Sequence, residues 1–228
     1  MQSSEEGTRI HQWTAAALLL GSSLFVVHLV ARSFITAGTG LATAARGSAW
    51  MPVHALGCIG ALLVLAGLPA LYRRIEETGW LPLLGLALIG LNWCFVGVFL
   101  SFLSVLVVPW LAEKAPFLLS GEAAQPRALI VTFLLGLAAQ LVGTGLLAAP
   151  YLRGDVTPRW AGVLLPASAI LGIVGDLVAP SGPSSNLALN LFSNLGTILF
   201  VVVLADQGLR ALTASSGPRS EAPTVHPR

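Results

Sequence analysis

The chain has 228 residues, of which 55% are hydrophobic and 10% are charged, and its mean hydropathy is +0.83. Soluble domains carry about 25% charged residues, so this chain has too little charge to cover a water-facing surface. The formal net charge of +2 is small and spread over the loops, which excludes a basic face for nucleic acid. The composition therefore predicts a membrane protein that has lipid, and no nucleic acid, as a partner.

Six apolar stretches fill most of the chain. A helix needs roughly 20 apolar residues to cross the hydrocarbon core, and the continuous apolar runs lack the alternation of a transmembrane β-barrel. We therefore expect an all-α integral membrane bundle of six transmembrane helices within residues 1–212, followed by a disordered cytoplasmic tail over 213–228. The predicted spans are residues 13–32, 51–72, 80–110, 128–151, 159–179 and 186–207.

Positive charges in the loops predict the orientation of these spans. With a cytoplasmic N-terminus, eight arginines fall inside: Arg9, Arg73, Arg74, Arg153, Arg159, Arg210, Arg219 and Arg228. Four cations fall outside: Arg32, Arg46, Lys114 and Arg127. The excess on one side favours a cytoplasmic location for both termini.

Tryptophans mark the ends of the predicted spans, as in the aromatic belt at the headgroup level. These residues are Trp13, Trp50, Trp80, Trp110 and Trp160. Small residues inside the fifth span, Ser168, Gly172 and Gly175, predict close packing of helix backbones.

Polar residues fall at a similar depth, near the outer face, in four of the predicted helices. His28 follows Trp13 by 15 residues, which places it about 22 Å from the inner boundary. Asp176 follows Trp160 by 16 residues, or about 24 Å. His54 lies about one turn into the second span. Because a carboxylate commonly orients a histidine, we take Asp176, His28 and His54 as candidate catalytic residues.

Side-chain amides extend this set as candidate ligand-binding residues. Asn186, Asn190 and Asn194 are spaced by four and share one face of the sixth span, whereas Asn92 and Gln140 lie nearer the membrane centre. Several alternatives remain open. Asn186 would cap its helix, the other amides would join helices by hydrogen bonds, and the histidines would be structural. Asp176 would lie at the surface if its span ended near Gly175.

Two cofactor interpretations use the same histidines. Haem b would be held between His28 and His54 if the two rings ligated an iron from opposite sides. A divalent metal would be held by both histidines and Asp176, with ligand types that suit zinc or iron, although no motif such as HExxH supports it. We therefore assign no metal site and leave haem b as an alternative.

The stretch from Gly154 to Leu165, which includes Pro158-Arg159-Trp160, resembles the start of a late helix in small bacterial membrane proteins grouped as domains of unknown function. His54-Ala55-Leu56-Gly57 and the later Leu68-Pro69-Ala70-Leu71-Tyr72 are similar to an early segment of such proteins. The resemblance implies a location in the bacterial inner membrane. It implies no activity and no functional residues.

The function that these patterns favour is the binding or handling of a small or lipid-soluble ligand in a polar pocket of the outer leaflet, with proton transfer. Asp176 would hold a proton or orient a histidine. Three alternatives stay open: an accessory subunit of a membrane complex, a membrane enzyme that acts on an isoprenoid or lipid with Asp176 as general acid, and a haem-binding redox protein.

Overall fold

The computed structural model describes residues 2–39, 41–119, 127–178 and 186–216, and the described chain is helical almost throughout. In chain order, the α-helices are α1 (Gln2–Thr36), α2 (Leu41–Arg46), α3 (Trp50–Ile75), α4 (Trp80–Asn92), α5 (Leu100–Lys114), α6 (Arg127–Arg153), α7 (Arg159–Val178) and α8 (Leu187–Ser216). Two short 3₁₀ turns, η1 (Glu76–Thr78) and η3 (Pro116–Leu119), and one π-helical segment, η2 (Trp93–Phe99), complete the order.

Six helical segments of the described chain are long and apolar enough to cross a membrane, which makes this an integral multi-pass membrane protein. They correspond to α1, α3, the continuous segment α4–η2–α5, α6, α7 and α8. The six predicted spans are therefore confirmed, and the long third one is a single segment of 35 residues. Helix α8 continues to Ser216; the rest of the predicted tail, residues 217–228, lies outside the described residues.

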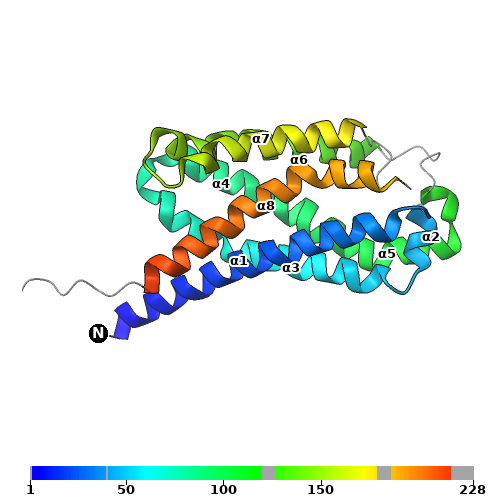
Figure 1. Cartoon of the computed structure of the whole chain (residues 1–228), viewed down its shortest axis with the longest axis horizontal. Coiled ribbons are helices and arrows are strands. Elements are labelled where there is room, and N and C mark those ends of the chain that lie inside the picture. The colour runs from blue at the N-terminus through cyan, green and yellow to red at the C-terminus, as the bar shows by residue number, and fades with distance from the viewer. Residues whose placement is uncertain (1, 40, 120–126, 179–185, 217–228) are drawn as a thin grey trace, which may run out of the picture.

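The spans form a closed ring of neighbours. Helix α1 packs between α3 and α8, α7 packs between α8 and α6, and α6 packs on α4. The third span closes the ring because α4 contacts α6 whereas α5 contacts α3. Figure 1 shows the N-terminus and the last turns of α8 at one end of the bundle, which we call the terminal end, and α2 at the other, which we call the far end.

The π-helical segment η2 lies where the third span passes from one neighbour to the other. Its wider turns bury Trp93 and Gly97. A Cβ atom at Gly97 would lie 2.6 Å from Cε3 of Trp93, so the glycine makes room for the indole. Segments of π-helix are rare and often accompany functional sites, and this one points its buried indole into the centre of the ring.

Close backbone contacts hold the helices together, because apolar side chains gain little by leaving lipid for each other. A Cβ atom at Gly85 of α4 would lie 2.7 Å from the carbonyl oxygen of Gly143 of α6. A Cβ atom at Gly196 of α8 would lie 2.4 Å from the carbonyl oxygen of Ser168 of α7. The fifth span therefore packs through small residues, as its sequence predicts.

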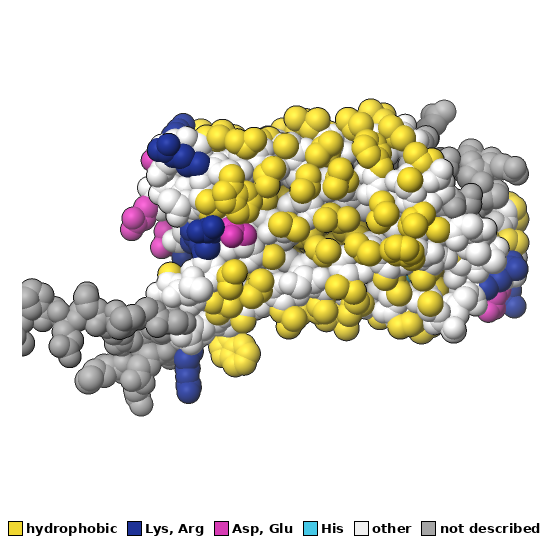
Figure 2. Space-filling view, viewed as in Figure 1, with side chains coloured by type: hydrophobic (Ala, Val, Ile, Leu, Met, Phe, Trp, Pro, Cys, Tyr) yellow, Lys and Arg dark blue, Asp and Glu magenta, His cyan; other side chains and the backbone are white. Residues whose placement is uncertain are grey.

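Apolar side chains cover much of the lateral surface, as expected for a bundle that faces lipid (Figure 2). Four of the five belt tryptophans are exposed: Trp80, Trp110 and Trp160 near helix ends, and Trp13 near the start of the first span at Arg9. Trp50 begins its span as predicted, but its side chain is 2% exposed, so it does not face lipid as a belt residue would. It packs with Ala44, Ala45 and Ala112 under the short helix α2, which the span prediction did not include.

Candidate functional site

The two histidines predicted to share a layer are in contact at the far end. His28 of α1 and His54 of α3 are each 3% exposed. Their ring centroids lie 5.1 Å apart, and the rings meet edge to face at 73°. Gly57 of α3 makes this approach possible, because a Cβ atom there would lie 2.6 Å from Cγ of His28.

Backbone carbonyls of α3 orient both rings. Nδ1 of His28 lies 2.9 Å from the carbonyl oxygen of Val53, and Nδ1 of His54 lies 2.9 Å from that of Trp50. Since a carbonyl oxygen only accepts, each Nδ1 must carry the proton. In the neutral ring this leaves a lone pair on Nε2. Neither Nε2 atom has a hydrogen-bond partner within the described chain, so both can accept a proton or a hydrogen bond.

A row of rings runs through the histidine pair, from Trp50 at the far end toward the middle of the bundle. Trp50 stacks on His54 with their ring centroids 3.9 Å apart, and the ring centroids of Phe25 and His28 lie 5.4 Å apart. Phe25 also packs edge to face on Trp93 of the π-helical segment, with their ring centroids 4.7 Å apart. Phe25 and Trp93 therefore give the histidine pair an apolar floor on the side of the membrane centre, whereas Trp50 covers the pair from the far end. The indole of Trp50 also donates to the carbonyl oxygen of Ser104 at 2.7 Å, which ties α3 to α5.

Arg32 joins the histidines, although the sequence analysis placed it in an outer loop. That placement was wrong: α1 continues to Thr36, and Arg32 is partly buried one turn beyond His28. Arg32 lies within electrostatic range of both histidines and of Asp176. Its spacing of four residues from His28 is the sequence signal that could have identified it.

Asp176 is held inside the fifth span. Helix α7 runs through Val178, so the alternative in which the span ends near Gly175 does not hold. The carboxylate is partly buried and interacts electrostatically with Arg32. Within the described residues no hydrogen bond or salt bridge joins these two charges. The two charges are therefore close enough to interact electrostatically without forming a direct ion pair.

The amides of α8 bind α1 rather than Asp176. Nδ2 of Asn190 donates to Oγ1 of Thr36 at 3.0 Å and to the carbonyl oxygen of Ser33 at 3.3 Å. Nδ2 of Asn194 donates to Oγ of Ser33 at 3.0 Å. These bonds fix the segment of α1 that carries Arg32. Asn186 instead caps α8, since its Oδ1 accepts from the backbone N–H of Ala188 at 2.9 Å.

Asn92 and Gln140 form a separate pair. Nδ2 of Asn92 donates to Oε1 of Gln140 at 2.8 Å, which links α4 to α6. Oδ1 of Asn92 is buried without a partner, and it faces Gly136, where a Cβ atom would lie 2.9 Å away. No hydrogen bond in the described chain connects this pair to the histidines, so we separate it from the site.

The geometry does not fit either cofactor interpretation. A haem held between His28 and His54 would need its porphyrin ring between the two imidazoles, but these rings contact each other. Among the described residues no three His, Cys, Asp or Glu side chains are arranged to hold a metal ion. Comparison of the chain with protein-family models, curated proteins and solved structures gave no match.

Proposed function

We propose that the far end of the bundle binds a small or lipid-soluble ligand, and that the histidine pair exchanges a proton with it. The observation that carries this proposal is the orientation of His28 and His54. Both Nδ1–H groups are used by backbone carbonyls, and both Nε2 lone pairs stay available, with Arg32 one helical turn beyond His28 on α1 and within electrostatic range of both rings. A histidine buried only for packing has no need of a free acceptor next to a cation.

Each charged group has a distinct role in this proposal. The guanidinium of Arg32 donates to an oxygen of the ligand, because Arg carries five N–H donors and no acceptor. Asp176 balances the charge of Arg32 and would take or return a proton. The aromatic row of Trp50, Phe25 and Trp93 accommodates apolar parts of the ligand. Asn190 and Asn194 act as positioning residues, since they hold α1 on α8.

We also propose that both termini lie in the cytoplasm of a bacterial cell and that the site lies in the outer leaflet. The helix ends at the terminal end carry most of the arginines of the described chain, including Arg73, Arg74, Arg153 and Arg159. An excess of loop cations on one side favours the cytoplasm for that side.

The first test is to purify the protein in mild detergent and to identify bound molecules by absorption and mass spectrometry. The wild-type protein should retain a defined lipid or isoprenoid. His28→Asn and Arg32→Gln should lose it, whereas Arg9→Gln, which removes an exposed cation of the same helix, should keep it. Asparagine suits the histidine test because its amide N–H can still donate to Val53 while Nε2 is absent. Retention by Arg32→Gln at the level of Arg9→Gln would overturn the proposal.

A second candidate is an accessory subunit of a membrane complex. The amides support it, since Asn194 binds Ser33 and Asn92 binds Gln140 in the manner of interhelical contacts that only set packing. This candidate predicts a purified protein that carries no ligand and that co-purifies with a larger complex at fixed stoichiometry.

A further inference from the structure

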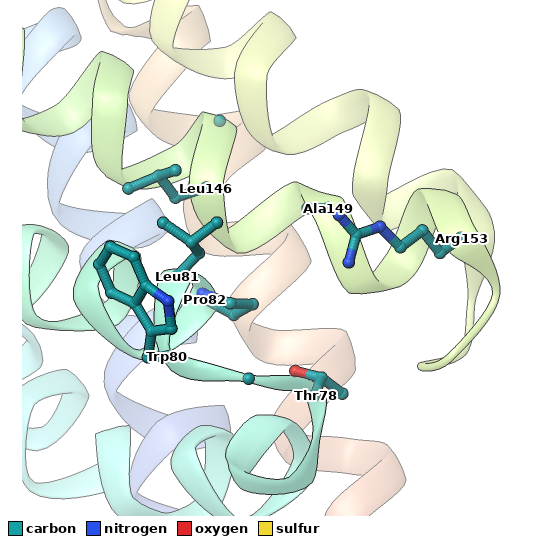
Figure 3. A pocket seen from close by; sticks show the side chains of 9 residues that line it. Thr78, Trp80, Leu81, Pro82, Leu146, Ala149 and Arg153 are labelled. Atoms are coloured by element: carbon teal, nitrogen blue, oxygen red, sulfur yellow. The ribbon is translucent and has the colours of Figure 1, made fainter.

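A groove between α4 and α6 opens at the terminal end, away from the histidines. Its volume is about 150 Å³, and it is lined by the turn Thr78–Gly79, by Trp80, Leu81 and Pro82 of α4, and by Gly145, Leu146, Ala149 and Arg153 of α6. Figure 3 shows Trp80 and Arg153 on opposite sides of the groove, with the guanidinium of Arg153 pointing back toward α4. The lining therefore combines one cation with an apolar wall.

We infer that this groove binds the headgroup of an anionic phospholipid, with its phosphate at Arg153. The charges are complementary: the lining contains a guanidinium and no carboxylate. Arg153 makes no hydrogen bond or salt bridge with a described residue, so its donors are available. Arginine fits phosphate oxygens through paired N–H donors, and basic pockets between transmembrane helices bind anionic headgroups.

The apolar part of the lining argues for a lipid rather than a free phosphate. Leu81 is 40% exposed beside the groove, and Leu84 continues the exposed apolar surface along α4 toward the membrane centre. An acyl chain would follow this surface while its headgroup stays at Arg153. Trp80, which is 70% exposed, suits the headgroup level because its ring is apolar and its N–H is polar.

Gly145, in the lining of the groove, allows a second test of the lipid site. A Cβ atom at Gly145 would meet nothing within 4 Å, so the glycine borders open space. A larger side chain there fills the groove without displacing a neighbouring helix. The substitution Gly145→Leu therefore blocks the proposed lipid site and leaves its charge unchanged.

The test is native mass spectrometry of the full chain with an equimolar mixture of phosphatidylglycerol and phosphatidylcholine of matched acyl chains. The wild-type protein should prefer the anionic lipid by about fivefold, the effect of one arginine near a charged surface. Arg153→Gln should lose this preference, whereas Arg9→Gln, with an exposed arginine at the same end but outside the groove, should keep it. Gly145→Leu should reduce retention of both lipids.

Three results would overturn the inference. The first is equal retention of the two lipids by the wild-type protein. The second is an unchanged preference in Arg153→Gln, which decides the matter even if Gly145→Leu fails to fold. The third is competition by glycerophosphoglycerol, which is the same singly charged phosphodiester headgroup without acyl chains; it would identify a soluble anion as the ligand. The inference is independent of the function proposed for the far end.

Discussion

His28 and His54 meet edge to face with their ring centroids 5.1 Å apart, and both rings are tied to carbonyl oxygens of α3. The bond from His28 to Val53 crosses from α1 to α3, so it fixes the relative height of the two helices as well as the ring. The bond from His54 to Trp50 stays within one helix turn. In each ring Nε2 is therefore the nitrogen that can accept a proton or bind a ligand.

This orientation predicts the tautomers of the two rings. The chain has four histidines, so nitrogen-15 labelling of histidine gives a spectrum simple enough to assign. Two of the rings should carry their proton on Nδ1 when neutral, because the carbonyl oxygens of Val53 and Trp50 can only accept. His28→Asn and His54→Asn should each remove one of these two signals. Protonation of both rings on Nε2 instead would contradict the hydrogen bonds.

Gly57→Ala should destabilise the protein and disturb the site. The added methyl group would lie 2.6 Å from the ring of His28, and overpacking of this kind costs about 1–3 kcal/mol. Thermal unfolding in detergent measures the effect. Gly172→Ala is the matched control, since a Cβ atom at Gly172 meets nothing within 4 Å. Equal stability of the two variants would show that His28 is not packed against α3 as described.

Trp50→Phe should lower the free energy of unfolding by about 1 kcal/mol, because it removes the hydrogen bond to Ser104 and keeps an aromatic ring on His54. Trp110→Phe serves as the comparison. Its indole is 58% exposed at a helix end, so its replacement should change stability little. The two variants would behave alike if Trp50 belonged to the interfacial belt, as its position in the sequence predicts.

The pair formed by Asn92 and Gln140 should show coupling in a double-mutant cycle. Each single leucine variant leaves the other amide without its partner, whereas the double variant replaces both polar groups by apolar ones. The interaction energy should be about 0.6 kcal/mol, the average for hydrogen bonds between transmembrane helices, and at most about 1.7 kcal/mol. Unfolding in detergent gives the four stabilities. Additive effects would mean that the two side chains do not meet.

Local features of the fold could be predicted from sequence because the bilayer limits them strongly. A helix must present about 20 apolar residues to cross it, so hydropathy alone gives the six spans, although the first, second, third and sixth extend beyond their predicted ends. The cap of α8 is also local, since Asn186 binds backbone groups two and three residues along the chain. The depth of His28 or Asp176 follows from a fixed rise per residue.

The sequence by itself therefore determined the class of protein, the six spans and the layer in which polar side chains lie. Only the tertiary structure decided which of those side chains meet, because depth along a helix says nothing of the direction in which a side chain points or of the neighbouring helix. Close contacts at glycines such as Gly57 set that choice. At Gly57 such a contact brings His28 to His54, while the packing of the other helices joins Asn194 to Ser33 and Asn92 to Gln140.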